Sequence, residues 1–263
     1  MKQPGKLYIV DGHALAYRSY FAFIRNPLIN KKGENTGAVF GFTRMLLLLR
    51  SKYDPRYLVV VFDSGEETAR HREFPAYKEH RPEMPGDMVS QLPWITEMTD
   101  ALGIKVVRES GVEADDLIAT LARRASADGV DVTIVTGDKD FFPLLSDRIH
   151  IIRPEKGTSL EEEIGPEYCV ERFGLEPSRV IDLLALMGDS ADNIPGVKGI
   201  GEKTAVKLLR EFGSLDAILE RIDEVEPPHL REKLRSGRES ALFSRDLATL
   251  RDVPLAVSLE DLA

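Results

Sequence analysis

The sequence predicts an α/β fold in which a mostly parallel sheet is flanked by helices and followed by a smaller helical domain. Strand and helix signals alternate through the first half of the chain, a pattern typical of βαβ units. The strands are rich in Val and Ile over their whole length, as expected when both faces of a sheet are covered. Strand signals stop after about residue 166, whereas helical signals continue.

Apolar runs and helical periods locate the individual elements. We expect strands at residues 6–11, 58–63, 105–109, 132–136 and 148–153, and helices near 13–24, 38–52, 88–102 and 114–127. Beyond the sheet, segments bounded by Gly or Pro indicate helices at 166–173, 177–187, 202–212, 214–221 and 238–250. The expected domains are therefore an α/β domain over residues 1–166 and a helical domain over residues 167–263.

Composition excludes several classes of protein. The 263 residues are 43% hydrophobic and 30% charged, which supports a folded core and argues against disorder. Cys169 is the single cysteine, so no internal disulfide can form and a reducing compartment is expected. The longest apolar run, residues 45–49, is too short to span a bilayer. We expect a cytoplasmic monomer with no membrane partner.

The charge is unevenly distributed along the chain. The net charge is −9, yet residues 1–53 carry nine Lys and Arg against two acids. Residues 109–192 carry nineteen acids against eight basic residues. A chain with one basic and one very acidic section can bind a polyanion with the first and metal ions with the second.

Nine carboxylates recur where a strand ends or a helix begins. In an open parallel sheet such strand ends face one crevice, so we expect these acids to gather there. Few basic residues neighbour them in the sequence, and Mg²⁺ or Mn²⁺ is therefore expected to balance their charge. The five histidines and the single cysteine show no zinc-ligand spacing. The nine acids are Asp11, Asp63, Glu113, Asp115, Asp116, Asp138, Asp140, Asp189 and Asp192.

The segment 64–92 has no steady helical or strand period. Basic and aromatic residues alternate in it, which suits binding of single-stranded nucleic acid through base stacking and phosphate contacts. Pro75 can only begin a helix. A helix over residues 75–81 would be short and would present Tyr77, Lys78 and Arg81 on roughly one side. A plain solvated loop is the alternative.

The segment 194–205 contains three glycines within a short stretch. A P-loop is excluded because Glu202 occupies the position that requires lysine. The pattern favours a helix–hairpin–helix turn, in which Gly196, Gly199 and Gly201 let the backbone approach a phosphate directly or through a monovalent cation such as K⁺. Lys198 and Lys203 add positive charge there.

Taken together, these motifs resemble the bacterial and phage 5′-nucleases, and most closely the N-terminal 5′→3′ exonuclease domain of bacterial DNA polymerase I. The resemblance covers nearly all of the chain and its motif set is specific. The motifs are Val10 to His13, Val61 to Asp63, Tyr77 to Arg81, Glu113 to Asp116, Thr136 to Asp140 and Gly188 to Gly201.

The resemblance implies a fold, an activity and partners. The fold would be a resolvase-like or PIN-like nuclease domain with an arch segment at about residues 64–92, followed by a helix–hairpin–helix (helix–three-turn–helix) element. The activity would be flap endonuclease and 5′→3′ exonuclease with two divalent metal ions. The partners would be DNA with a 5′ flap or 5′ end, and either a linked or a separate DNA polymerase. Pro75 departs from a continuous arch helix, so a shorter or more mobile arch is expected.

The resemblance also assigns roles to residues. Asp11, Asp63, Glu113 and Asp115 or Asp116 would lie nearest the first metal ion, and Asp138, Asp140, Asp189 and Asp192 toward the second. Lys78 and Arg81 would polarise the scissile phosphate, Tyr77 would stack on a base and Arg18 would bind a phosphate. The expected catalytic set is Lys78, Arg81, Asp11, Asp63 and Asp116. The expected DNA contacts are Arg18, Arg70, Arg72, Tyr77, Lys78, Arg81, Gly196, Lys198, Gly199, Gly201 and Lys203.

Three other functions compete with this interpretation. A PIN-type ribonuclease shares the acidic site but does not need the hairpin or the arch. A non-catalytic module that binds branched DNA would tolerate loss of the acids, yet all nine are present. A dehalogenase-type phosphatase would want an Asp-x-Asp after the first strand, and residues 11–13 lack it.

Overall fold

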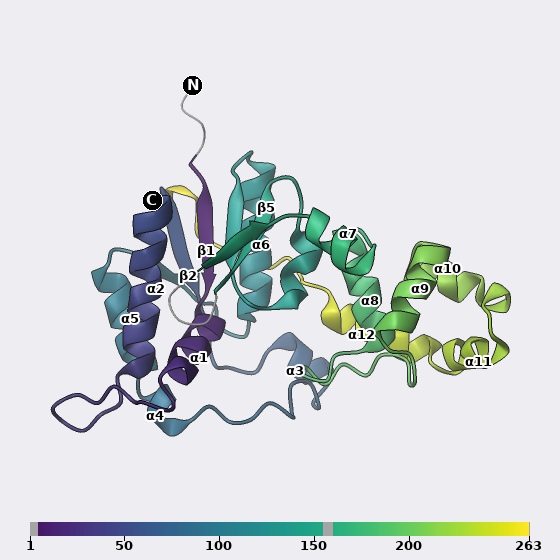
Figure 1. Cartoon of the computed structure of the whole chain (residues 1–263), viewed down its shortest axis with the longest axis horizontal. Helices are drawn as coiled ribbons and strands as arrows, with labels where there is room; N and C mark the ends of the chain where they lie inside the picture. The colour runs from purple at the N-terminus through teal and green to yellow at the C-terminus, as the bar shows by residue number, and fades with distance from the viewer. Residues whose placement is uncertain (1–4, 155–159, 263) are drawn as a thin grey trace.

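The computed structural model describes residues 5–154 and 160–262 and contains a six-stranded sheet (Figure 1). The strand order is β3-β2-β1-β4-β5-β6, and all neighbouring strands are parallel except β5 and β6. The expected mostly parallel sheet is confirmed, and the antiparallel edge strand β6 is an addition to it. The strands are β1 (Leu7–Asp11), β2 (Tyr57–Val61), β3 (Lys105–Val107), β4 (Val132–Val135), β5 (Ile149–Pro154) and β6 (Leu160–Ile164).

Helices cover both faces of the sheet. Alternate residues of β1 enter different cores, because successive side chains of a strand point to opposite faces. Leu7 and Ile9 pack in the core that contains α6 (Ala114–Ala127). Tyr8 and Val10 pack in the core beneath three other helices. Those helices are α1 (Gly12–Ala22), α2 (Gly37–Tyr53) and α5 (Leu92–Ala101).

The arch segment, residues 64–92, contains two short helices, α3 (Ala69–Glu73) and α4 (Gly86–Val89). Of the two alternatives for residues 75–81, the helix does not form, because this stretch forms successive turns. Lys78 has a φ of 58°, a left-handed conformation that a right-handed helix does not admit. Its N–H donates to the carbonyl of Asp192 at 3.1 Å instead of to a preceding helical turn.

The remaining described residues form the helical domain that was expected from the sequence. One helix was not expected, α11, in which Leu230 and Leu234 are the buried residues of a largely charged segment. In Figure 1, α9, α10 and α11 project away from the sheet, while α8 and α12 lie nearer to it. The elements are α7 (Glu167–Phe173), η2 (Pro177–Arg179), α8 (Val180–Met187), α9 (Glu202–Phe212), α10 (Leu215–Glu220), η3 (Ile222–Glu224), α11 (Pro228–Ser236), α12 (Arg238–Ala248) and η4 (Glu260–Leu262).

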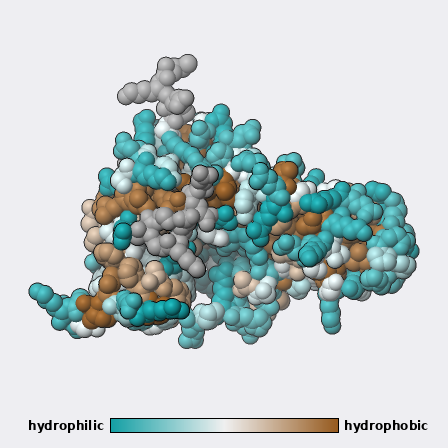
Figure 2. All heavy atoms as spheres, viewed as in Figure 1, coloured by the Kyte–Doolittle hydropathy of each residue, from teal (hydrophilic) through white to brown (hydrophobic). Residues whose placement is uncertain are grey.

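After α12 the chain returns along the α/β domain. Arg123 of α6 donates to the carbonyl of Leu250, and the N–H of Val253 donates to Thr120 Oγ1. Hydrophilic residues cover much of the face seen in Figure 2, and hydrophobic residues show in a band across its left half, at its lower left and among the helices on the right. Within residues 5–154 and 160–262, no helix combines the length and the apolar character needed to cross a bilayer.

Candidate active site

The ends of β1, β2 and β4 place three carboxylates at one edge of the sheet. Asp11 ends β1 and caps α1, because its Oδ1 accepts the N–H of Ala14 at 3.0 Å. Asp63 follows β2 and its Oδ1 accepts the N–H of Ala114, at the start of α6, at 2.7 Å. Asp138 follows β4 and caps the helix η1 (Lys139–Leu144). Asp11 and Asp138 therefore cap local helices, whereas Asp63 fixes the start of α6.

Burial and mutual repulsion disfavour the charged form of several of these acids. Burial, together with the charges of Asp138 and Asp63, raises the pKa of Asp11 to about 6. Burial and the neighbouring Asp138 raise the pKa of Asp140 to about 8. Burial and the charge of Asp11 also raise the pKa of Asp115. The cluster is thus short of positive charge at this edge.

Asp63 behaves in the opposite way. Burial alone would raise its pKa, but contacts with His13 and the Ala114 N–H outweigh burial and hold the pKa at about 2. His13 Nδ1 lies 3.2 Å from Asp63 Oδ2. Asp63 is therefore a carboxylate throughout the neutral pH range, as a cation ligand should be.

Basic side chains from the arch segment reach into the cluster. Lys78 Nζ lies 2.7 Å from Glu113 Oε2, 3.6 Å from Asp115 Oδ2 and 3.9 Å from Asp192 Oδ2. Arg81 Nη2 lies 2.5 Å from Asp192 Oδ1. Few basic residues neighbour these acids in the sequence, and residues distant in sequence supply the basic contacts. Divalent cations are therefore not the only positive charges that the site can hold.

Arg70 and Asp116 form a buried ion pair on the far side of this cluster. Arg70 is 3% exposed, and its Nη1 and Nη2 donate to the two oxygens of Asp116 at 2.7 and 2.9 Å. The N–H of Arg251 also donates to Asp116 Oδ1. Asp116 was expected to bind metal and Arg70 to contact DNA. In this structure each side chain is buried and paired with the other, which favours neither role.

Tyr77 is likewise buried instead of exposed. It is 4% exposed and packs with Ile194 and Leu247 in a small apolar cluster. Its hydroxyl lies 3.3 Å from Glu113 Oε2. The expected stacking of Tyr77 on a base does not fit this position, because the ring docks the arch segment onto the helical domain.

The loop between α8 and the hairpin brings Asp189 and Asp192 to the site. A β-bridge pairs Asp189 with Ile194, and Lys139 lies 2.9 Å from Asp189 Oδ2. Asn193 has a φ of 56°, and its Nδ2 donates to the carbonyl of Ala76 at 2.7 Å. This bond joins the loop to the arch segment. The importance of Asn193 was missed, although Asn tolerates the left-handed region better than most residues.

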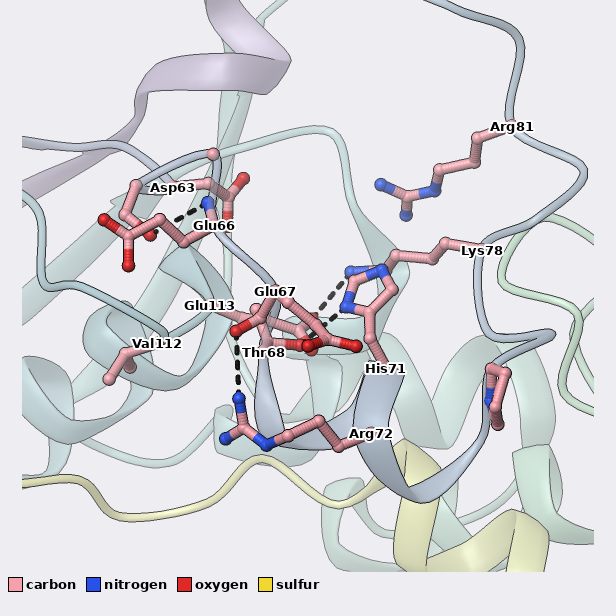
Figure 3. Close-up of a pocket in the computed structure, with 13 residues that line it drawn as sticks. Asp63, Glu66, Glu67, Thr68, His71, Arg72, Lys78, Arg81, Val112 and Glu113 are labelled. Carbon is pink, nitrogen blue, oxygen red and sulfur yellow. Dashed lines mark hydrogen bonds and ion pairs between the residues drawn. The ribbon is translucent and has the colours of Figure 1, made fainter.

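A hollow of about 700 Å³ opens beside the acids. Figure 3 shows Lys78 and Arg81 reaching into it from one side and Asp63 from the other. His71 and Arg72 of α3 also line it. Arg72 is exposed and donates to the carbonyl of Glu67 at 3.2 Å. The hollow is wide enough for a nucleotide-sized group and offers both signs of charge.

The hairpin lies apart from the hollow, in the helical domain. Gly196 and Gly199 have φ values of 60° and 81°, which favour glycine, whereas Gly201 is extended and open to solvent. The exposed Lys198 and Lys203 flank it. Lys233 Nζ donates to the Gly199 carbonyl at 3.0 Å. Arg18, another expected DNA contact, lies half-buried on α1 in the α/β domain.

The donor set fits hard divalent cations. Asp140 Oδ1 is buried without a hydrogen-bond partner among the described residues, and oxygen ligands are what Mg²⁺ and Mn²⁺ prefer. In the described ranges, no three Asp, Glu, His or Cys side chains already converge closely enough to hold one ion. Lys78 and Arg81 lie among the acids, so cation binding requires these side chains to move.

Two family models together match almost the whole chain. Residues 6–174 match the 5'-3' exonuclease N-terminal resolvase-like domain, and residues 175–263 match the 5'-3' exonuclease C-terminal SAM fold. DNA polymerase I of Bacillus subtilis (strain 168) is 44% identical over 264 residues, covering 100% of this chain and 30% of that protein. DNA polymerase I of Treponema pallidum (strain Nichols) is 46% identical, covering 99% and 26%. The chain thus spans less than a third of these relatives.

Solved structures share the fold at lower identity. The T5 D15 protein co-crystallised with metal ions has a TM-score of 0.75 at 23% identity, covering 93% of this chain and 89% of that one. The catalytic core of Rad2 in complex with DNA substrate has a TM-score of 0.61 at 22% identity, covering 95% and 81%. The sheet and the helical domain agree with the two family models, and the chain belongs to the 5'-3' exonuclease family.

Proposed function

We propose that this chain hydrolyses phosphodiester bonds in DNA that carries a 5′ flap or a free 5′ end, using two divalent cations, Mg²⁺ or Mn²⁺. One observation carries the proposal: carboxylates from separate strand ends gather at one edge of the sheet, beside a hollow that Lys78 and Arg81 enter. The relatives are DNA polymerases I, and the Rad2 core is described in complex with DNA substrate.

The acids divide into two groups by position. Asp11, Asp63, Glu113 and Asp115 surround the ends of β1 and β2, and we assign them to one cation. Asp138, Asp140, Asp189 and Asp192 surround the end of β4 and the loop after α8, and we assign them to the other. Paired divalent cations, when bound, activate water and stabilise the leaving oxygen of an in-line displacement.

Lys78 and Arg81 bind and orient the scissile phosphate in this proposal. Both contact carboxylates in the DNA-free chain, and a phosphate is a second anionic partner of the same kind. Burial would lower the pKa of Lys78, but the charges of Asp115, Glu113 and Asp192 raise it well above its ordinary value. Lys78 is therefore a fixed positive charge and not a proton donor at neutral pH.

The hairpin contacts the duplex backbone in this proposal. Exposed backbone at Gly201 and the N-terminus of α9 suit a phosphate, and Lys198 and Lys203 add attraction. A K⁺ ion at residues 196–201 is part of the proposal, and it would share the Gly199 carbonyl with Lys233. We also propose a cytoplasmic monomer that acts with a linked or separate DNA polymerase, in keeping with the relatives.

A labelled 5′-flap duplex tests the proposal. Cleavage should require Mg²⁺ or Mn²⁺, stop in EDTA and be lost by orders of magnitude in Asp63→Ala, a variant that should fold normally. An RNA flap compared in parallel separates this activity from a PIN-type ribonuclease. Tight binding of the flap without any cleavage in Mg²⁺ or Mn²⁺ would instead identify a non-catalytic branched-DNA module, and full activity in EDTA would refute the metal assignment.

A further inference from the structure

Thr68 stands at the N-cap of α3 but does not cap it. An N-cap threonine ordinarily accepts an N–H of the first helical turn with its hydroxyl. Here the side chain makes no such bond. Its Oγ1 instead donates to Glu113 Oε1 at 2.9 Å, and the residue is 6% exposed. The hydroxyl is committed to a carboxylate of the site and not to the helix that it begins.

His71 completes this contact on the other side of the hydroxyl. Its Nδ1 lies 2.8 Å from Thr68 Oγ1. Glu113 Oε1 is the acceptor of the Thr68 hydroxyl in this contact. Thr68 has one hydroxyl proton and gives it to Glu113. His71 Nδ1 must therefore carry a proton and donate it to Thr68, which fixes the tautomer of the ring.

The two oxygens of Glu113 are held in different ways. Oε2 contacts Lys78 Nζ at 2.7 Å and the Tyr77 hydroxyl at 3.3 Å, both from the turns of the arch segment. Oε1 contacts Thr68 and lies 3.3 Å from Arg70 Nη1, both from the buried base of that segment. A cation that takes Oε2 displaces Lys78 and leaves the Thr68 contact to Oε1 intact.

The same arrangement occurs once more in the site. Thr136 Oγ1 donates to Asp11 Oδ2 at 2.9 Å and accepts the N–H of Asp138 at 3.1 Å. In both places a buried threonine hydroxyl accepts one N–H and donates its proton to one carboxylate oxygen. The acid is Asp11 at the end of a strand in one case and Glu113 at the start of a helix in the other. The backbone supplies the N–H at Thr136, whereas at Thr68 a side chain in the hollow supplies it.

We propose that His71 and Thr68 are positioning residues that orient Glu113 for a divalent cation, through the path His71 Nδ1–H to Thr68 Oγ1–H to Glu113 Oε1. The inference rests on the function proposed above. Carboxylates that ligate a metal are usually hydrogen-bonded in turn, and loss of such an outer partner typically weakens metal affinity or activity about 10–100-fold. Neither residue contacts the cation itself.

Mn²⁺ affinity, measured by electron paramagnetic resonance without DNA, tests the path. Thr68→Val keeps the shape and removes the hydroxyl, and should weaken binding roughly 10–100-fold, whereas Thr68→Ser should restore it. Thr96→Val is the matched control, since Thr96 lies on α5 and donates to the Leu92 carbonyl. His71→Leu should also weaken binding, and His71→Asn should recover it by keeping an N–H near the Nδ1 position.

A double-mutant cycle shows whether Thr68 acts through Glu113. In a Glu113→Gln background, Thr68→Val should have no further effect on Mn²⁺ affinity, because the pair is coupled. An equal loss in both backgrounds would overturn the inference, as would wild-type affinity in Thr68→Val or in the smaller Thr68→Ala. Normal binding in His71→Leu would remove His71 from the path. Failure of the wild type to cleave a flap, with these affinity changes present, would refute the proposed function alone.

Discussion

Replacement of Asp11 by Asn should stabilise the metal-free protein while it removes cleavage. Asp11 is 6% exposed, and burial raises its pKa from 3.8 to about 6. The folded state therefore binds this proton more tightly than the unfolded state, and stability falls as the pH rises from the unfolded to the folded pKa. Above about pH 6 the folded protein has lost all the stability that the protonated form of Asp11 gives it. The rise of the pKa from 3.8 to about 6 corresponds to about 3 kcal/mol in the free energy of unfolding.

The Asn side chain can keep the local hydrogen bonds. Its Oδ1 can accept the Ala14 N–H that Asp11 accepts at 3.0 Å. Its Nδ2 can donate to Thr136 Oγ1, which already accepts the Asp138 N–H and has a second lone pair. The substitution thus removes a titrating charge, and the Thr136 hydroxyl proton that Asp11 Oδ2 accepts must turn to another acceptor. The expected gain approaches about 3 kcal/mol at about pH 8 and shrinks towards zero near pH 4.

Urea unfolding followed by circular dichroism in EDTA measures this gain at the two pH values. Asp131→Asn makes the same chemical change at an exposed position that pairs with Arg148, and should alter stability little. Added Mg²⁺ should raise the stability of the wild type more than that of Asp11→Asn, because the variant lacks a ligand. A gain of equal size at both pH values, or no gain in EDTA at the higher pH, would refute the electrostatic argument.

Three further predictions address the hairpin, the arch cations and the acids. A Cβ added at Gly201 would have no atom within 4 Å, so Gly201→Val should fold normally. It should weaken flap-duplex binding, measured by fluorescence anisotropy, roughly tenfold, which corresponds to the loss of about one charge-assisted hydrogen bond. Unchanged affinity would make residues 194–205 an ordinary turn. Lys78→Met and Arg81→Ala should each slow single-turnover cleavage on the order of 10²-fold, whereas the exposed control Glu79→Ala should not. Lys78→Met should also tighten Mn²⁺ binding, because the lysine ammonium no longer competes for the carboxylates. Weaker Mn²⁺ binding would contradict this. The pKa of Asp140 near 8 means that Mg²⁺ must displace a proton at neutral pH, so calorimetry in buffers of different ionisation enthalpy should show proton release that vanishes at higher pH.

The sheet was predictable because its strands carry their own signals. The strands β1, β2 and β4 are apolar runs that Asp or Thr ends, and the structure places them at the centre of the sheet. The edge strand β6 was missed because residues 160–164 read Leu-Glu-Glu-Glu-Ile, with no apolar run. The helix α11 was missed for the same reason, since most of its residues are charged or polar. Tertiary contacts stabilise these two elements, although their own sequences have weak hydrophobic patterns.

The acids of the site were predictable, but their partners were not. A strand end can be read from local sequence, whereas Lys78 and Glu113 lie 35 positions apart and Arg81 and Asp192 lie 111 positions apart. No spacing rule connects such pairs. This is also why Arg70 was assigned to DNA, since its burial depends on contacts with α6 and the end of α12.

The exposure of the basic side chains separates those that can leave the acids from those that cannot. The Arg81 side chain is 49% exposed, so it can exchange Asp192 for a phosphate at little cost. The Lys78 side chain is 13% exposed and the Arg70 side chain 4%. Arg70 contacts Asp116 and two backbone carbonyls, and a phosphate could replace only the bonds to Asp116. Cations that replace Lys78 and Arg81 would free both for the DNA, while Arg70 continues to hold the base of the arch segment in place.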